Sequence, residues 1–500
     1  MRFEFRFGGD DRSPRPAPRA GAPMRVLVLA DLGGRGQRQP DAAQPLAERP
    51  QMALSHETLE TTFARLAPGL RLRLDPSGPE LAIEFGGIGE FHPDELFQRL
   101  GLFEALRETR RRLQDPATFE TTAAELGGAE AATPRATIVA EEDAETIGRL
   151  LGSAPRDLGG VRVEGRLRED VRRMVKGMIA ADVVPQADPR QAEWIASVDR
   201  TISRQTRALL HHPAFQALES TWRSIEGLLS QIEIGEEIQV SLLDVTRQEL
   251  AADLVASGGE LERSATYRQL VERGAGTPGA GPWSVIVGGY AFGSNPEDVV
   301  LLGALGAIAS RAGGPFLAAA TPAILGCGSL AAAPDPRAWR PFEAGEEERW
   351  AALRSSAWAR WIGLAMPRVL SRLPYGPRTD ATERFAFEEL PPERDHEAYL
   401  WGNPAFACAT LLANSFLESG WSMDPGDHLE LGSLPAHTYR LDGESRLQPC
   451  AEVVLTERAL EAILGRGIMP FMSFPDRNAV RLVRFQSLAD PAAALAGPWS

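Results

Sequence analysis

Two glycine-rich stretches are the first places to look for chemistry, because glycine lets a backbone approach a phosphate closely. The stretch Gly274–Gly281 contains Pro278 but no lysine, whereas a P-loop requires Gly-Lys followed by Ser or Thr. The pair Gly33-Gly34 follows an apolar run but does not continue into a G-x-G-x-x-G pattern. We therefore interpret the first stretch as a loop and the second as a tight turn, and we predict no cofactor.

Histidines beside acids are the second candidates, because both can hold a metal ion or move a proton. His211 and His212 are adjacent, so on a helix their side chains point about 100° apart and cannot close on one metal. We expect a capping or packing role for this pair.

A further histidine, His428, lies among Asp424, Asp427 and Glu430. These residue types can bind a metal, but the segment has turn composition, and we interpret it as a solvated loop. A metal-dependent or hydrolytic enzyme, motivated by His428 and its acidic neighbours, is kept as a third hypothesis.

Nucleophilic or acid–base catalysis has little support in the remaining residues. Gly326–Ser329 resembles a nucleophile elbow only superficially, and no base is evident for its Cys327. Glu388 and Glu389 are neighbours whose side chains alternate faces, which predicts a charged rim rather than an acid–base couple. We predict no catalytic residue and no metal ligand, and we expect a protein that is not an enzyme.

Composition narrows the possible partners and the compartment. The formal net charge is −15, whereas a protein that binds duplex nucleic acid needs a basic footprint, so nucleic acid is not an expected partner. The cysteines, Cys327, Cys408 and Cys450, form no CxxC pair and predict no disulfide framework, which suits a reducing cytoplasm. The apolar run Val299–Ala309 is too short to span a bilayer and is interpreted as a buried helix, so no membrane insertion is expected.

The elements that must position these residues begin with a small N-terminal region. Arg25–Asp31 is an apolar run that predicts a buried strand. Leu70–Leu74 and Leu81–Phe85 alternate apolar and polar residues around turn residues, which predicts a hairpin. Pro93 opens a predicted helix that carries apolar residues at helical spacing through Leu113.

A larger region follows in which helices and apolar strands alternate. We predict a long helix over residues 207–230, strands at Ile238–Leu243 and Trp283–Val287, and a helix from Asp298 to Ser310, followed by another apolar segment, 315–320. This order favours an α/β fold with some α+β character, made of a small N-terminal α/β domain and a larger α/β domain.

Many ordered motifs in the larger region resemble the large subunit of the type VI secretion contractile sheath. The resemblance covers residues 167–490. Its motifs are Leu210–Trp222, Trp283–Phe292, Leu353–Arg360, Leu364–Gly376, Phe385–Glu389, Leu400–Phe406, Ser415–Trp421 and Cys450–Thr456. The N-terminal region resembles the small subunit of the same sheath through Arg25–Arg35, Leu66–Leu70 and Phe91–Leu96.

The resemblance implies a single chain in which two normally separate subunits are fused. The expected division is a small-subunit-like domain over 1–126, a linker over 127–166 and a large-subunit-like domain over 167–500. The resemblance implies a structural subunit. Such subunits stack helically around an inner tube, and contraction of the assembled sheath drives the injection of effectors. The implied partners are the chain itself or other sheath subunits, the inner tube protein, the baseplate and an AAA+ unfoldase that recycles the sheath, all in the cytoplasm.

Two short features of the linker could serve such an assembly. Ile138 and Val139, and Val161 with Val163, are apolar pieces that we regard as candidate strands exchanged between subunits, or as clips onto their own domain. The candidate contact for the unfoldase is formed by Ile147, Leu150 and Leu151, which could equally belong to an ordinary amphipathic linker helix.

Two departures from the family lead to an alternative. The family usually has an acidic residue where this chain has Gly289, and its large subunits continue past the position of Trp499-Ser500. The alternative expectation is therefore a non-polymerising sheath cap or baseplate-associated adaptor.

Overall fold

The structure of the protein is a computed structural model, which describes residues 21–37, 44–75, 79–127, 191–273, 281–390, 395–441 and 443–499. The chain forms two compact units built from interleaved segments. The first consists of Met1–Leu66, Ala217–Leu373 and Tyr399–Ser500, and the second of Ala67–Gln216 and Pro374–Ala398.

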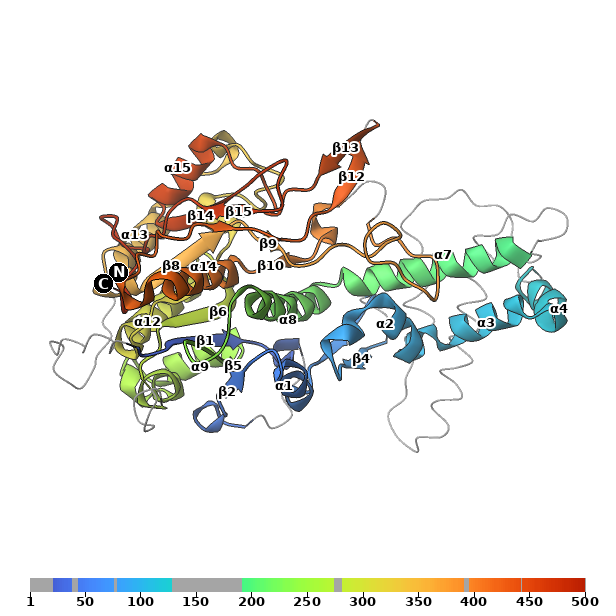
Figure 1. Cartoon of the computed structure of the whole chain (residues 1–500), viewed down its shortest axis with the longest axis horizontal. Coiled ribbons are helices and arrows are strands. Elements are labelled where there is room, and N and C mark those ends of the chain that lie inside the picture. Colours follow the sequence, from blue (N-terminus) through green and yellow to red (C-terminus); the bar gives the residue numbers. More distant parts are fainter. Residues whose placement is uncertain are drawn as a thin grey trace. The chain divides into compact units, whose positions relative to one another are not determined.

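A nine-stranded sheet organises the first unit, and one of its interior strands, β1, comes from near the N-terminus (Figure 1). Strand β1 (Met24–Ala30) pairs in parallel with β5 (Ile238–Asp244) on one side and with β6 (Val285–Phe292) on the other. Val26 lies opposite Val240 of β5 and Val285 of β6. The β1 sequence MRVLVLA is apolar almost throughout, as expected for a strand buried on both faces.

The other strands extend the sheet in both directions. Their order is β11-β15-β14-β8-β7-β6-β1-β5-β2. Strands β5, β1, β6, β7, β8 and β14 are parallel, whereas β2 and β15 pair antiparallel with β5 and β14. The remaining bounds are β2 (Met52–Leu54), β7 (Phe316–Ala320), β8 (Ile362–Met366), β11 (Glu430–Leu431), β14 (Ile468–Ser473) and β15 (Val480–Leu482).

Helices cover both faces of this sheet. Helix α12 (Pro296–Ala312) packs with alternate strand residues such as Leu27, Ile286 and Phe316 in one hydrophobic core. Helix α14 (Pro404–Ser419) also contacts β6, β7 and β8, but its residues lie outside that core, so it covers the opposite face. The first unit also contains α1 (Leu59–Leu66), α9 (Arg247–Ala256), α10 (Ala265–Tyr267), α13 (Ala344–Arg354), α15 (Glu457–Gly465) and two ribbons, β9 (Val369–Leu370) with β10 (Trp401–Gly402) and β12 (Thr438–Leu441) with β13 (Glu444–Leu447).

The ends of α12 show how local sequence sets an element. Asn295 caps the helix by accepting a hydrogen bond from Asp298 N–H at 2.9 Å, and Pro296 occupies the first turn. Gly313 ends the helix at φ 106°, a left-handed conformation that glycine adopts without steric cost.

The second unit combines a hairpin with helices. Strands β3 (Gly69–Leu72) and β4 (Leu81–Glu84) pair antiparallel, which confirms the predicted hairpin. Helix α3 packs against α4 and α7, and Arg110 of α3 pairs with Asp199 of α7 at 2.7 Å. Among the described residues of this unit, the longer helices are α2 (Pro93–Arg99), α3 (Glu104–Gln114), α4 (Pro116–Gly127) and α7 (Gln191–Leu210).

The α/β fold class is confirmed, and two predicted helices need correction. The helix expected from Pro93 to Leu113 is two helices, because Leu100 is extended and Gly101–Phe103 form a 3-10 turn. The helix expected over residues 207–230 is also divided, into α7 and α8 (Pro213–Gln231). Proline lacks an N–H group and disfavours helical geometry in the residue before it, which separates the two helices at His212.

Candidate functional site

The candidate site lies at the carboxyl ends of β1, β5 and β6. Strands β5 and β6 are consecutive along the chain but lie on opposite sides of β1, so the strand order reverses at this point. In open α/β sheets, ligands bind outside the carboxyl ends of strands at such a reversal of strand order. Asp31 follows β1, Asp244 ends β5, and Thr246 and Glu249 begin α9.

Asp244 joins the turn after β1 to the end of β5. One carboxylate oxygen accepts hydrogen bonds from the backbone N–H groups of Leu32 and Gly33, at 2.8 Å and 3.2 Å. The other oxygen lies 3.4 Å from Nε of Arg35. Asp31 closes the same turn by accepting from the N–H groups of Arg35 and Gly36, at 2.7 Å and 2.8 Å. Two carboxylates therefore hold the turn that contains Gly33 and Gly34 through backbone N–H groups of that turn.

Glu249 collects two guanidinium groups at the start of α9. Thr246 and Glu249 form a capping box, in which each side chain accepts from the other residue's N–H, at 3.1 Å and 2.8 Å. The Glu249 carboxylate also accepts from Arg35 at 3.0 Å and from both terminal nitrogens of Arg49, one of them at 2.9 Å. Arg35 and Arg49 additionally donate to the carbonyl of Asp244, at 3.0 Å and 3.1 Å.

The electrostatics of these two acids differ. Burial raises the pKa of Asp244; Arg35 opposes this rise, Asp31 adds to it, and the N–H groups of Gly33 and Leu32 oppose it. Burial would also raise the pKa of Glu249, but hydrogen bonds from Arg49 and Thr246 and the charges of Arg35 and Arg49 give a net lowering. Glu249 is therefore the carboxylate that its surroundings hold in the charged form.

Tyr290 of β6 adds a buried hydrogen bond to the network around Asp244 and Glu249. Its hydroxyl donates to the carbonyl of Val245 at 2.6 Å. Burial, followed by the charges of Asp244, Asp31 and Glu249, raises the pKa of Tyr290 well above its usual value. The hydroxyl stays protonated and acts as a hydrogen-bond donor. The arrangement thus fastens segments near residues 31, 49 and 245 to one another through charge-assisted hydrogen bonds.

A second internal ion pair joins α8 to Arg372, which follows β9. Glu219 is fully buried, and its two oxygens accept from Arg372, at 2.7 Å and 3.1 Å. The Arg372 side chain is 10% exposed, so both charges are largely removed from water. Three residues further along the same helix, Trp222 donates a hydrogen bond from its indole nitrogen to the carbonyl of Leu32 at 3.0 Å. Helix α8 is thereby linked to the turn after β1.

The histidines predicted to cap or pack do so in part. His212 accepts from the N–H of Ala214 through Nδ1 at 3.2 Å, which confirms a capping role at the start of α8. Within the second unit, Nε2 of His211 lies 3.9 Å from a carboxylate oxygen of Glu389. Glu389 is 1% exposed and accepts from the N–H of Tyr375 at 2.7 Å, so it is not part of the predicted charged rim. The sequence could not show this, because the burial arises from the fold around residue 375.

The acidic loop around His428 is held by local contacts. Asp424 and Asp427 bond to backbone N–H groups of their own turn, at 2.7 Å and 2.8 Å. His428 pairs with Glu418 on α14, and both side chains are exposed. Glu430 lies on β11 and pairs with Arg477 at 3.0 Å. The structure therefore spreads these residues over a loop and two elements.

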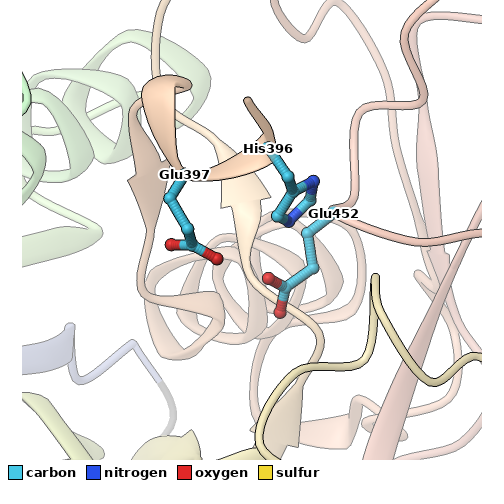
Figure 2. A group of neighbouring side chains, drawn as sticks. All are labelled: His396, Glu397 and Glu452. Atoms are coloured by element: carbon cyan, nitrogen blue, oxygen red, sulfur yellow. The ribbon is translucent and has the colours of Figure 1, made fainter. Parts of the chain in front are cut away.

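Three other potential metal ligands are drawn in Figure 2: His396, Glu397 and Glu452. His396 and Glu397 lie on the short helix η11 (His396–Ala398), which belongs to the second unit, whereas Glu452 belongs to the first, so they are not treated as one site. Within its own unit, Glu452 is 4% exposed and accepts from Nε of Arg368 at 2.8 Å.

The remaining predicted residues fall into two groups. Cys327, Cys408 and Cys450 are buried free thiols, in line with the absence of a predicted disulfide framework. The candidate exchange residues Ile138, Val139, Val161 and Val163, and the candidate unfoldase residues Ile147, Leu150 and Leu151, lie outside the described residues. Among the described helices, none is both long enough and apolar enough to cross a membrane.

Sequence reasoning missed the network around Asp244 and Glu249. One local signal was present, since Thr246-x-x-Glu249 has the pattern of a capping box before a helix. Nothing local pairs Arg49 with Glu249, because the two residues are 200 positions apart and meet only when β2 docks on β5.

Comparison with known proteins identifies relatives of the larger region. Residues 192–489 match the family described as VipB: EvpB/VC_A0108, tail sheath N-terminal domain. The chain is also 34% identical over 306 residues to the type VI secretion system sheath protein TssC1 of Pseudomonas aeruginosa PAO1. That alignment covers 60% of this chain and 61% of the relative, so the similarity spans about three fifths of either protein.

Proposed function

Because the chain belongs to the VipB tail sheath family, we propose that it is a structural subunit of a type VI secretion contractile sheath, and not an enzyme. The observation that carries this proposal is the match of residues 192–489 to the sheath domain, supported by 34% identity to a sheath protein. In this proposal the subunits assemble around an inner tube in the cytoplasm, and contraction of the assembly injects effectors.

The polar network supports a structural role for the carboxyl edge of the sheet. In a nucleotide-binding α/β protein that edge offers free backbone N–H groups to phosphate. Here the N–H groups of Leu32, Gly33, Arg35 and Gly36 bond to Asp31 and Asp244. A rigid subunit that transmits force benefits from such internal fastening, because contraction of a sheath is a rearrangement between bodies that keep their own packing.

Fusion of a small subunit to a large one is the second part of the proposal. It assigns residues 1–126 to the small-subunit-like part, 127–166 to the linker and 167–500 to the large-subunit-like part. Strands β1 and β2 precede the family match, yet both belong to the sheet that the matched region forms. If these strands came from a separate chain, the two chains would have to form a tight heterodimer to complete the sheet. In a fused chain the same strands associate within one molecule, at a high effective concentration.

The proposed partners are further sheath subunits, the inner tube protein, the baseplate and an AAA+ unfoldase. Exchange of strands between subunits would use Ile138, Val139, Val161 and Val163. Recycling would use Ile147, Leu150 and Leu151. Deletion of residues 141–152 is expected to abolish binding to the unfoldase, measured with purified proteins, and unchanged binding would remove this part of the proposal.

Assembly provides the main test. The full chain is expressed with its inner tube protein, and the lysate is examined by negative-stain electron microscopy. Tubes with a regular axial repeat are expected, because a sheath subunit builds an open helical array through heterologous contacts. Discrete monomers or small rings would instead support the alternative of a sheath cap or baseplate-associated adaptor. Expression without the tube protein is the control that shows whether the tube acts as a template.

A further inference from the structure

Most of the described side chains of the ribbon formed by β12 and β13 are exposed rather than packed against the rest of the first unit. The ribbon projects beyond the strands of the large sheet in Figure 1. Thr438, Arg440, Glu444, Ser445 and Arg446 are exposed. A two-stranded ribbon without a buried face is marginally stable alone, whereas three or more strands with an apolar face are stable. This ribbon therefore lacks the stabilisation that additional strands would supply.

The base of the ribbon is nevertheless well fixed. His437 is buried, and its Nδ1 lies 2.9 Å from the hydroxyl of Tyr399. Gln448 donates from its N–H to the carbonyl of His437 at 2.8 Å. The thiol of Cys450 donates to the carbonyl of Pro435 at 3.4 Å. The strands are thus held at a defined place on the first unit, and among the described residues no further strand pairs with the outer edge of either one.

The direction of the backbone groups follows from the register. Thr438 pairs with Leu447, Tyr439 with Arg446 and Arg440 with Ser445. In an antiparallel pair, hydrogen-bonded and non-hydrogen-bonded positions alternate, and Gln448 with His437 is a hydrogen-bonded position. Arg440 with Ser445 is consequently a non-hydrogen-bonded position. The N–H and C=O of Ser445 point away from β12, along the open edge of β13.

The charges on β13 complement a second copy of the same strand. Glu444 and Arg446 lie two positions apart on one face, and they are in contact with each other at 3.5 Å with side chains 74% and 50% exposed. In an antiparallel pair centred on Ser445, each Glu444 lies opposite an Arg446 of the second copy. The Ser445 residues then face each other at a position where both exchange N–H and C=O bonds. Charge and backbone direction thus agree on one register.

We propose that β13 pairs antiparallel with β13 of a second copy of this chain, centred on Ser445, to form a four-stranded sheet β12-β13-β13-β12 across a two-fold axis. The large sheet is less suited to such pairing, because its edge strands β2 and β11 have only three and two residues. Pairing through β12 is also disfavoured, since an equivalent two-fold centred on the outward-facing Arg440 would place two arginines opposite each other. This contact is isologous and goes beyond the proposed sheath function, which requires heterologous contacts.

Cysteine cross-linking of the full chain tests the register directly. Glu444→Cys and Arg446→Cys are prepared as separate variants and oxidised alone or mixed. Opposite residues at a non-hydrogen-bonded position have Cα atoms about 4.5 Å apart, which suits a disulfide. Two copies of residue 444 would lie roughly 8 Å apart, which is too far. The native thiols are buried and do not interfere. We expect a linked dimer on non-reducing gels in the mixture only.

Backbone and charge variants give an independent readout by sedimentation. Ser445→Pro removes an outward N–H and is expected to weaken dimerisation, whereas Arg440→Pro, at the matched outward position of β12, leaves it unchanged. Glu444→Arg places like charges opposite one another and is expected to raise the dimer Kd about tenfold, and the double variant E444R/R446E restores it.

The proposal has clear failing outcomes. Cross-links that form equally in the single variants and in the mixture would exclude this register. A wild-type chain without any two-fold dimer, or equal effects of the two proline variants, would overturn the pairing itself. Capture of a strand from another protein by a monomeric chain would also overturn it. None of these outcomes depends on whether the chain also assembles into tubes, so the sheath function is tested separately.

Discussion

At the level of single residues, Glu249 has the greatest number of charged partners in the network at the carboxyl edge of the sheet. Its carboxylate accepts from Arg35, Arg49 and the N–H of Thr246. The Arg49 side chain is 8% exposed, so water cannot easily replace a lost partner. Removing one member of such a group costs more than its net contribution, because the other charges remain buried.

We predict that Glu249→Gln lowers the free energy of unfolding at neutral pH by about 1–3 kcal/mol. The folded-state pKa of Glu249 is lowered, so its contribution is fully present above the usual pKa of glutamate and is lost as pH falls through the folded-state pKa. The difference between wild type and variant should therefore shrink with acidification. Urea unfolding followed by circular dichroism at several pH values measures it.

The control is Glu260→Gln. Glu260 pairs with Arg263 on the surface, with side chains 49% and 75% exposed, and such pairs contribute less than about 1 kcal/mol. A loss at Glu249 no larger than that at Glu260, or a difference that does not change with pH, would show that the network does not hold a charged glutamate.

The three thiols allow a second prediction at this scale. Burial raises the pKa of Cys450 to about 11 and raises the pKa of Cys408 further. Burial, with a smaller effect of Glu452, also raises the pKa of Cys327. Because the thiolate is the reactive form, all three should react slowly with a thiol-specific chromogenic reagent in the native protein and quickly in denaturant. Rapid native reaction of any one of them would contradict its burial.

At the level of elements, the contact between β1 and β6 depends on a residue without a side chain. A Cβ atom on Gly289 would lie 2.8 Å from Cβ of Ala30 in β1, closer than packed carbon atoms approach. In the sequence, Gly289 is a departure from the sheath proteins that this chain resembles, which usually have an acidic residue at this position. The structure gives a steric reason for glycine here, since β1 and β6 are adjacent strands and the residue is only partly exposed.

We predict that Gly289→Ala destabilises the protein by about 1–3 kcal/mol, and that Gly289→Asp destabilises it more, because the strands must separate to admit the side chain. Gly235→Ala is the matched control, since nothing lies within 4 Å of its added Cβ. Thermal unfolding of the three variants measures the difference. Equal melting temperatures for Gly289→Ala and Gly235→Ala would mean that β1 and β6 tolerate the added atom.

At the level of the whole molecule, the compact units are interleaved along the chain. Their boundaries lie after residues 66, 216, 373 and 398. The division expected from the sequence is different, with a small-subunit-like part over 1–126, a linker over 127–166 and a large-subunit-like part over 167–500. That division rests on resemblance to two sheath subunits and stays a prediction. The N-terminal segment supplies a strand in which Val26, Val28 and Leu29 are fully buried, so it is part of the core rather than an appendage.

We predict that cutting the chain between residues 152 and 153 leaves the fragments associated. A protease site is inserted there, and the folded protein is cleaved and analysed by size exclusion. A single peak containing both fragments is expected, because β1 is hydrogen-bonded to β5 and β6 on both sides. Elution of the N-terminal fragment by itself in native buffer would contradict this. The same sample in denaturant, where the fragments must separate, is the control.

The sequence by itself determined the local elements, because apolar periodicity and capping residues act within a few positions. The strand at Arg25–Asp31, the hairpin near residue 70 and the helix from Asp298 were all evident in this way. Tertiary structure decided which strands became neighbours, since pairing of β1 with β5 joins residues more than 200 positions apart. It also decided the candidate site, because Arg49, Asp244 and Glu249 carry no joint signal until the sheet forms. Long-range pairing depends on burial of both faces of the sheet at once, which no short pattern encodes.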